Sequence, residues 1–452
     1  VTGGSINKTG SFYFEATGVG SETALARIIE LVKRAQSSRP PIQRLADRIA
    51  SVFVPVIFGI ASVTFLSWWL TTGTFSEAMI NAVAVLIISC PCALGLATPT
   101  AILVGTGKGA ELGFLIKSGE VVETAHQIKM VVLDKTGTLT YGRPVVTDVI
   151  PAGDRTTESL LQLAASMEQN SEHPIGLAIV NEANRLKVST TKPDGFEAVA
   201  GGGLRGRIND TNVLLGSERF MKHEGCTIED ARSEPLREEG KTVIFVAEDS
   251  VYAGIIAIAD EVKEGSEAAI RELKQAGIEV AMLTGDNLRT AEAVARAVGV
   301  DLVVAEVQPE DKANRIIALQ QERGVVAMVG DGINDAPALA QADVGIAIGT
   351  GTDVAIESAD VALMSGDLRG IPAIIRLSRQ TMRIIKQNLF WAFAYNAILV
   401  PVAALGLLTP WGGPTLAAGA MAFSSITVVT NALRLKRFDP RARPCAVHKG
   451  GK

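Results

Sequence analysis

The stretch Lys129-Met-Val-Val-Leu-Asp-Lys-Thr-Gly-Thr-Leu-Thr140 leads an apolar run into one carboxylate, Asp134, at the start of a glycine-containing turn. Residues Met130 to Leu133 predict a short strand buried on both faces, because the run contains no polar residue. The small and polar residues Lys135 to Thr138 predict a loop whose backbone amides can surround a phosphate. We interpret Asp134 as a nucleophile or a cation ligand; an ordinary aspartate-capped turn is the alternative for this residue taken alone.

The composition is apolar for a chain of 452 residues, a length that predicts two or three domains. Hydrophobic residues make up 47% and the mean hydropathy is +0.27, and the apolar residues gather in blocks that indicate membrane spans. The net charge of -5 and the lack of a Lys/Arg-rich run give no reason to expect nucleic acid as a partner. The four cysteines are too few and too unevenly spread for a disulfide framework, which favours a reducing, cytosolic face.

Four apolar runs have the length of roughly twenty residues that is needed to cross a bilayer. Lys and Arg flank each pair of runs, but neither occurs in the two short links within the pairs. By the positive-inside rule the links are extracytoplasmic and the flanks are cytoplasmic, so we expect the lipid bilayer as a partner. The runs are Val52 to Leu70, Ala78 to Leu103, Leu389 to Leu408 and Leu416 to Leu433.

The second run is interrupted by Cys90-Pro-Cys92 and by Thr98-Pro-Thr100. A proline inside a membrane helix exposes a backbone carbonyl that hydrocarbon does not solvate. Broken helices of this kind mark the binding sites of transporters, whereas a lone proline more often only shapes helix packing. The two thiols that flank this proline favour a metal site formed by Cys90 and Cys92.

Three further apolar runs, in the polar region from Lys108 to about Gln387, also end in glycine-containing loops. Helical patterns such as Thr290 to Val298 separate them, and this alternation predicts a doubly wound parallel sheet. Lys312 begins another predicted helix. Sites on such sheets lie at the carboxyl ends of the strands. The loops expected there contain Thr284, Asp286, Asp331, Asn334 and Asp335.

These residue types suit phosphoryl transfer to Asp134. A carboxylate that attacks a phosphoryl group faces charge repulsion, so it needs Mg²⁺ held by further carboxylates. Asp331 and Asp335 are the predicted Mg²⁺ ligands beside Asp134. Lys312 and the Thr284 hydroxyl can neutralise and orient the phosphoryl oxygens, and the expected product is an aspartyl phosphate.

Four motifs in these loops carry a family resemblance. Asp134-Lys-Thr-Gly-Thr138, Thr284-Gly-Asp286, Pro309-Glu-Asp-Lys312 and Gly330-Asp-Gly-Ile-Asn-Asp335 together resemble the phosphorylation domain of P-type ATPases, a branch of the haloacid dehalogenase superfamily. The resemblance implies that ATP phosphorylates Asp134 and that Mg²⁺ is required. It also implies catalytic roles for further residues in the motifs, which are Lys135, Thr136 (also as an Mg²⁺ ligand), Gly285, Asp286 and Asn334.

An insertion from about Gly142 to Tyr252 separates the predicted nucleophile strand from the rest of its sheet. It contains a helical pattern near Leu160, the segment Ser171-Glu-His-Pro-Ile175 and the alternating strand Thr242 to Val246. The insertion is similar to the nucleotide-binding domain of the heavy-metal branch of the family. That resemblance implies adenosine contacts from Glu168, His173, Gly201 and Gly203.

The apolar cores of the four runs contain no Asp, Glu, Lys or His. Thiolates select soft ions, Cu(I) above all, although they also bind Zn²⁺. A Zn²⁺ carrier is expected to offer a carboxylate, so we expect Cu(I) as the transported ion, with Zn²⁺ or Cd²⁺ as the alternative. The set also resembles the copper branch, which implies Cu(I) ligands at Cys90, Cys92, Tyr395, Asn396, Met421 and Ser425. Hydrogen bonding between helices is the alternative role for the tyrosine, the asparagine and the serines, with Ser424 evenly balanced between the two.

We therefore expect an ATP-driven exporter of Cu(I), with the ion delivered by a cytosolic copper chaperone. The bacterial plasma membrane is the expected location, with the catalytic domains in the cytoplasm. A membrane-tethered phosphatase or metal-binding protein without transport is the alternative. Thr136 disfavours a phosphatase, since phosphatases of the superfamily usually have a second Asp at that position.

The expected fold class is a multidomain α/β and helical membrane protein. It combines a haloacid-dehalogenase-like Rossmann phosphorylation domain with an inserted α+β nucleotide-binding domain and four transmembrane helices. The opening Val1-Thr-Gly-Gly4 resembles the inside of a domain, so we expect a fragment without the family's Thr-Gly-Glu loop, earlier membrane helices or N-terminal Cys-x-x-Cys domain. The predicted segments are the end of an actuator domain (1–36), a transmembrane hairpin (37–107), the first segment of the phosphorylation domain (108–142), the nucleotide-binding domain (143–252), the second segment of the phosphorylation domain (253–387), a second transmembrane hairpin (388–435) and a tail (436–452).

Overall fold

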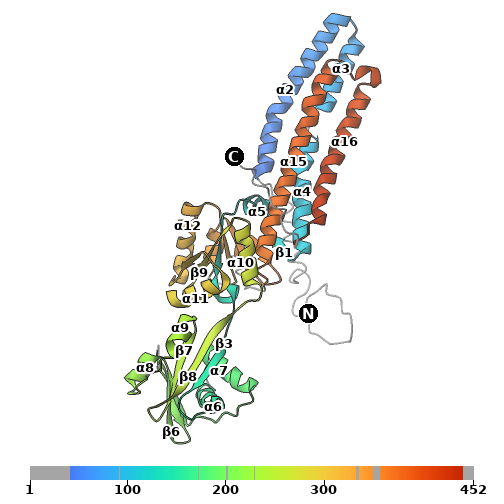
Figure 1. Ribbon diagram of the computed structural model, residues 1–452. Coiled ribbons are helices and arrows are strands. Elements are labelled where there is room, and N and C mark those ends of the chain that lie inside the picture. Colours follow the sequence, from blue (N-terminus) through green and yellow to red (C-terminus); the bar gives the residue numbers. More distant parts are fainter. Residues whose placement is uncertain are drawn as a thin grey trace, which may run out of the picture.

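The computed structural model describes residues 41–90, 92–169, 171, 173–199, 202–228, 230–331, 335–349 and 357–440. A bundle of helices, a domain with a mainly parallel sheet and a domain with an antiparallel sheet follow one another along the long axis of the molecule (Figure 1). The expected remnant of an actuator domain at 1–36 and residues 441–452 of the expected tail lie outside the described residues.

Helices from both ends of the described chain form the bundle. Two segments are long and apolar enough to cross a membrane, judged by length and composition alone: Pro41–Thr72 and Pro414–Arg437. Phe75–Ile88 is apolar but shorter, so the number of four spans stays a prediction. The bundle helices are α2 (Pro41–Thr72), α3 (Phe75–Ile88), α4 (Cys92–Glu111), α15 (Gly370–Ala404) and α16 (Pro414–Leu433).

The second apolar run divides at only one of the two expected interruptions. Helix α3 ends at Ile88 and α4 begins at Cys92, so the Cys-Pro-Cys segment separates two helices as expected. The expectation of a second break at Thr98-Pro-Thr100 was wrong, because Pro99 lies inside α4. A proline removes only one helical hydrogen bond, and packing of α4 between α15 and α16 accommodates the helix around it.

The parallel sheet confirms the predicted doubly wound architecture. Its strand order is β1-β13-β12-β11-β2-β9-β10, and all neighbours are parallel except the edge pair β1 and β13. The nucleophile strand β2 therefore lies near the centre, where a run of apolar residues is expected. The strands are β1 (Phe114–Ile116), β2 (Met130–Asp134), β9 (Glu279–Leu283), β10 (Leu302–Val304), β11 (Val326–Gly330), β12 (Val344–Ile348) and β13 (Val361–Leu363).

Strand β2 is apolar at every position before Asp134 because it contacts a hydrophobic core on each face. Val131 and Leu133 point into the core on the side of α5, α10, α11 and the start of α15, whereas Met130 and Val132 point into the core beside α12 and α13. The two-residue period of a strand produces this alternation. The covering helices are α5 (Gly119–Ala125), α10 (Ser266–Gln275), α11 (Leu288–Val298), α12 (Lys312–Arg323) and α13 (Ala336–Gln341).

The insertion forms a separate antiparallel sheet with the order β3-β8-β7-β6-β5-β4. Helices α6 (Thr157–Glu168) and α7 (Pro174–Arg185) pack on one face, and α8 (Glu218–His223) and α9 (Ser233–Glu238) pack on the other. The strands are β3 (Thr140–Pro151), β4 (Gly195–Val199), β5 (Gly203–Ile208), β6 (Thr211–Gly216), β7 (Thr242–Glu248) and β8 (Val251–Val262).

Strands β3 and β8 form a ribbon that joins the two domains, with Thr140 opposite Val262. The predicted domain boundaries at residues 142 and 252 therefore fall inside strands. The boundary predicted at residue 387 falls inside α15, whose first turns pack on the parallel sheet through Ile371 and Ile374 and whose last turns pack in the bundle through Val400 and Ala403. One continuous helix thus connects the parallel sheet to the bundle (Figure 1).

Candidate functional site

Asp134 is the last residue of β2 and lies at the carboxyl edge of the parallel sheet, with only 5% of its surface exposed. The register of β2 pairs Asp134 with Leu283, so Thr284 follows at the same edge. Strand β11 ends at Gly330 and delivers Asp331 there. Parallel strands thus bring together loops that are far apart in the sequence, as the doubly wound topology predicts.

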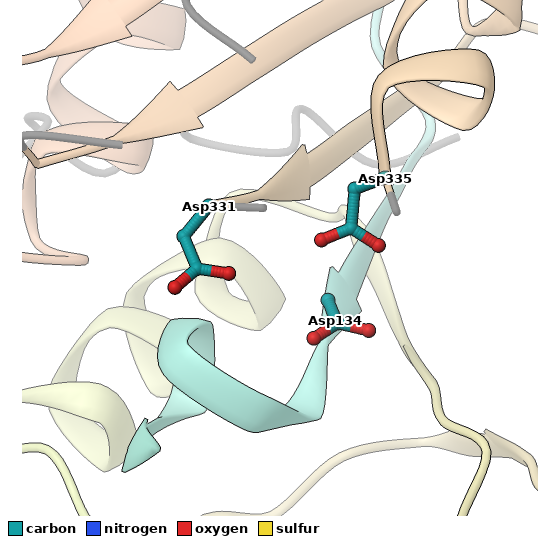
Figure 2. A group of neighbouring side chains, drawn as sticks. All are labelled: Asp134, Asp331 and Asp335. Carbon is teal, nitrogen blue, oxygen red and sulfur yellow. The ribbon is translucent and has the colours of Figure 1, made fainter. Parts of the chain in front are cut away.

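Three carboxylates meet at this edge. One oxygen each of Asp134, Asp331 and Asp335 lies within 4.8 Å of the others. Figure 2 shows the three side chains converging from the ends of two strands and the start of a helix. Lys312, the first residue of α12, donates hydrogen bonds to Asp134 Oδ1 at 2.6 Å and to Asp335 Oδ1 at 2.7 Å. Asn334 lies outside the described residues.

The carboxylates outnumber the cations that touch them. Burial, and then the charge of Asp335, raise the pKa of Asp134 to about 7 although Lys312 opposes the shift. Burial and Asp335 also raise the pKa of Asp331. Burial lowers the pKa of Lys312, but Asp134 and Asp335 outweigh it and leave that pKa raised. A buried excess of negative charge with hard oxygen donors fits a divalent cation such as Mg²⁺.

The path of the loop after Asp134 depends on Gly137. Gly137 has a φ of 77°, and a Cβ at this position would collide with the Asp331 carboxylate. Glycine alone therefore permits the loop Lys135–Leu139 to pass this close to the carboxylates. Thr136, a predicted Mg²⁺ ligand, is exposed beside Gly137.

The loop after β9 closes another side of the site. The Thr284 hydroxyl is buried and accepts a hydrogen bond from the Asp286 backbone N–H at 3.1 Å. Asp286 forms an ion pair with Lys135, whose side chain is also buried. Gly285 is exposed between them. Lys135 and Asp286 thus join the first and second predicted motifs directly.

The predicted nucleotide residues occupy one side of the inserted domain. Glu168 ends α6 and is 7% exposed, and its Oε2 atom has no hydrogen-bond partner among the described residues. Burial raises the pKa of Glu168, although Ser171 and His173 partly counter it. His173 is exposed, caps α7 and accepts a hydrogen bond at Nδ1 from the Ile175 N–H at 3.3 Å. The unpartnered buried oxygen needs a donor, which a ligand such as the adenine amino group can supply.

Two glycines permit close packing in this part of the inserted domain. A Cβ at Gly176 would collide with the Glu168 carboxylate, and a Cβ at Gly203 would collide with the Leu215 carbonyl. Gly203 begins β5, on the sheet against which α6 packs. Gly201 lies outside the described residues.

A second cluster of predicted residues lies in the helix bundle, around a small cavity. The cavity is lined by uncharged residues only, among them Cys90 beside the helix break, Tyr395 and Asn396 from α15 and Met421 from α16. Ser424 lines the cavity, whereas Ser425 is not among the lining residues. The side chain of Cys92 lies outside the described part.

Sequence reasoning missed Lys263, which follows β8. Its side chain contacts the Gly137 carbonyl from a position 126 residues away along the chain. None of the four sequence motifs includes Lys263, so only the pairing of β3 with β8 reveals it. Ser424 lines the cavity because of the rotation of α16 about its own axis. The apolar sequence of α16 does not determine this rotation.

Several known proteins are similar to this chain in sequence or in fold. The family model of haloacid dehalogenase-like hydrolases matches residues 128–343. The copper-exporting P-type ATPase of Staphylococcus saprophyticus is 53% identical over 441 residues, which cover 97% of this chain and 54% of that protein. The corresponding protein of Staphylococcus aureus strain MW2 is 52% identical over 450 residues, covering 98% and 55%. The chain thus spans about half the length of these curated relatives.

A solved structure is also similar to this chain, and the match covers a larger share of that protein than of the curated relatives. The crystal structure of a zinc-transporting PIB-type ATPase in the E2.Pi state matches with a TM-score of 0.79 and 37% identity, covering 94% of this chain and 69% of that one. The resemblance inferred from the four motifs is thereby confirmed, together with the haloacid-dehalogenase-like phosphorylation domain. This chain belongs to the P-type ATPases.

Proposed function

We propose that the chain is the catalytic and ion-conducting portion of an ATP-driven Cu(I) exporter that forms an aspartyl phosphate on Asp134. The observation that carries the proposal is the convergence of Asp134, Asp331, Asp335 and Lys312 at one sheet edge, joined by α15 to a cavity lined by uncharged and sulfur-containing residues. The copper-exporting relatives at 52–53% identity support the same ion.

Phosphoryl transfer requires an ionised nucleophile near a phosphate whose charge is balanced. An oxygen of Asp134 attacks the γ-phosphorus of ATP, a P–O bond to the carboxylate forms, and the bond to the bridging oxygen breaks so that ADP leaves. Lys312 holds Asp134 at 2.6 Å and is placed to stabilise the transferred oxygens, with the buried Thr284 hydroxyl beside it. Asp134, Asp331 and Asp335 would hold Mg²⁺ with Thr136, and this ion supplies charge neutralisation between nucleophile and phosphate.

The inserted domain would hold the nucleotide through Glu168, His173, Gly201 and Gly203. The buried Oε2 atom of Glu168, which has no partner among the described residues, suits an amino group of the base, and the exposed ring of His173 suits stacking. Because the ribbon β3–β8 is the connection between the two sheets, ATP bound here would reach Asp134 by approach of the two domains.

The cavity suits a soft, monovalent ion better than Zn²⁺. We propose Cys90, Cys92, Tyr395, Asn396, Met421 and Ser425 as its ligands, with Ser424 on the cavity wall. Thiolate and thioether donors prefer Cu(I), whereas hard divalent charge calls for a carboxylate, and none is among the lining residues. The zinc transporter of similar fold keeps Zn²⁺ or Cd²⁺ as a second candidate. Delivery by a cytosolic chaperone, a bacterial plasma membrane and cytoplasmic catalytic domains complete the proposal.

The test is phosphoenzyme formation by the whole protein with γ-labelled ATP. We expect a hydroxylamine-sensitive label that depends on Cu(I), and we expect Asp134→Asn to abolish it because the nucleophilic oxygen is lost. Asp301→Asn is the matched control, since Asp301 is a partly exposed carboxylate paired with Lys274 on the same domain. Labelling of Asp134→Asn would overturn the assignment. Stimulation by Zn²⁺ but not by Cu(I) would establish the second candidate, and release of phosphate without a Cu(I)-dependent label would favour a phosphatase.

A further inference from the structure

Lys263 occupies the junction between the ribbon and the parallel-sheet domain. It directly follows β8, and its backbone N–H donates to the Leu139 carbonyl at 2.9 Å. Its half-buried side chain turns to the same loop and donates to the Gly137 carbonyl. The backbone and the side chain of Lys263 therefore bind two carbonyl groups, those of Leu139 and Gly137, in the loop that follows Asp134.

The Gly137 peptide is held from both sides. The Asp331 carboxylate packs against the Gly137 Cα so closely that no Cβ fits, while Lys263 binds the Gly137 carbonyl. Glycine normally gives a loop many possible backbone conformations, but these two contacts restrict Gly137 to one of them. The position of this peptide, next to Asp134 in sequence and Asp331 in space, therefore depends on Lys263.

Lys263 also supplies a cation to the carboxylate that lacks one. Lys312 bonds Asp134 and Asp335, and Lys135 pairs with Asp286. No ion pair of Asp331 is found among the described residues, and Lys263 is the lysine with the larger influence on its charge. Three lysines are thus distributed over the carboxylates of the site.

A carboxylate on the ribbon completes the junction. Asp260, in β8, accepts a hydrogen bond from the Thr140 hydroxyl at 2.6 Å and one from the Arg143 backbone N–H at 3.0 Å. Burial lowers the pKa of Lys263, and the charges of Asp331 and Asp260 partly counter this effect. Ser266 adds a hydrogen bond from its hydroxyl to the Leu139 carbonyl at 3.1 Å. Residues 260–266, from the end of β8 to the start of α10, therefore form hydrogen bonds to the phosphorylation loop at Gly137 and at residues 139–140.

We propose that Lys263 is a positioning residue for phosphoryl transfer: it fixes the Gly137 carbonyl and places a positive charge beside Asp331, so that the ribbon carrying the inserted domain holds the phosphorylation loop in its reactive geometry. The proposal rests on the phosphorylation of Asp134 proposed above. The competing role is a lysine that only stabilises the end of β8.

The experiment compares Lys263→Met, Lys263→Gln and Lys263→Arg in the whole protein. We expect Lys263→Met to slow phosphoenzyme formation at saturating ATP by about 10- to 100-fold, the range for loss of a hydrogen bond from a charged donor. The KM for ATP should change less than about twofold, since the nucleotide residues lie on the other domain. Lys263→Gln keeps a donor without the charge and should be intermediate, and Lys263→Arg should restore the rate to within about threefold of wild type.

Hydrogen exchange of the loop amides supplies a readout that does not depend on activity. Lys263→Met should accelerate exchange in residues 135–141, whereas Lys274→Met should leave that segment and the phosphorylation rate unchanged. Lys274 is the matched control because it also joins a carbonyl, that of Gly299 at 3.1 Å, to a carboxylate, Asp301 at 2.6 Å.

Each outcome decides the proposal. A wild-type rate for Lys263→Met would overturn it, and so would a slow rate with unchanged exchange in residues 135–141 or an equal loss in Lys263→Arg. If the wild-type protein forms no phosphoenzyme, the proposed function fails, while the exchange comparison still shows whether Lys263 positions the loop.

Discussion

The two polar centres of this chain differ in the kind of group that lines them. At the sheet edge, Asp134, Asp335 and Lys312 are buried and carry ionisable groups. In the bundle cavity, Tyr395, Asn396 and Met421 bring polar or polarisable atoms without a formal charge. Charged oxygen and nitrogen atoms suit phosphate with a hard divalent cation, whereas uncharged and sulfur donors suit a soft ion. The donor atoms thus suit the two centres to two different kinds of ligand.

Both centres nevertheless form where regular structure stops. Asp134 ends β2 at the edge of a sheet, and Cys90 lies in the gap between α3 and α4. At the end of a strand or helix, backbone groups and side chains are not fully used in the packing of the core, so they are available to bind a ligand. Helix α15 joins the two centres, because it begins on the sheet and carries Tyr395 and Asn396 in the bundle.

After the loss of Asp134 itself, the largest expected effect belongs to Lys312, because it is the cation that touches two carboxylates of the charged centre. Lys312→Met leaves Asp134 and Asp335 without their hydrogen-bond donor at a buried position. We expect phosphoenzyme formation to fall about 100-fold or more, the scale for loss of a buried group that stabilises developing charge. The rate of labelling by ATP measures the effect.

Lys274→Met is the control for Lys312 as well, since its side chain is 44% exposed and pairs with one partly exposed carboxylate. It should leave labelling unchanged. If both variants label at the wild-type rate, the dense charge at the sheet edge has no catalytic role, and the contrast between the two centres loses its functional meaning.

The next effect concerns the uncharged centre. Met421→Leu keeps the volume of the side chain but replaces a thioether by carbon, and Asn396→Leu removes a carbonyl donor. We expect the Cu(I) concentration for half-maximal phosphorylation to rise by about tenfold for either variant, the lower end of the range for disturbed metal sites. The ATP concentration for half-maximal phosphorylation should stay constant, because these residues lie in the bundle. A parallel rise in the ATP requirement would mean that the variants disturb the fold instead.

A smaller effect separates the two neighbouring serines of α16. Ser424 is 7% exposed and lines the cavity, whereas Ser425 is partly exposed and does not line it. Ser424→Ala should raise the Cu(I) requirement by about 2- to 10-fold, as expected for one hydrogen-bonding group, and by more than Ser425→Ala does. The opposite order would restore Ser425, the ligand expected from the sequence, and would imply a rotation of α16 when the ion binds.

The serines also show what the sequence can and cannot determine. Strand β2 and the start of α12 at Lys312 follow from local rules, because a strand buried on both faces needs an apolar run and Pro309 and Asp311 favour a helix start. Neighbouring residues on a helix point about 100° apart, so the choice between Ser424 and Ser425 depends on packing against other helices. Lys263 depends on the register of two strands that are joined through the entire inserted domain.

At Pro99, too, packing rather than local sequence decides the structure. A proline in an apolar run predicts a break from local sterics, but α4 continues through Pro99 because its neighbours pack around the helix. At Cys90 the same rule succeeds, since α3 ends at Ile88 and α4 begins at Cys92. Local chemistry therefore identifies where a break is possible, and packing decides whether it occurs.

The smallest expected effect is a pH dependence that the charged centre, unlike the bundle cavity, should cause. The pKa of Asp134 is raised from 3.8 to about 7, chiefly by burial and then by Asp335. Between these values Asp134 binds more protons in the folded protein than in the unfolded chain, so without Mg²⁺ its contribution to the folding stability should be greatest below about pH 4 and be lost as the pH rises to about 7. Asp134→Asn removes this titration, and the midpoint of thermal unfolding in a chelator should then decline less over that interval, by a few degrees. Asn396→Leu is the control, because the cavity contributes no titrating carboxylate and the substitution should leave the pH slope unchanged. An equal slope in Asp134→Asn and wild type would show that Asp134 is ionised in the folded protein throughout, with Lys312 balancing its charge even without a divalent cation.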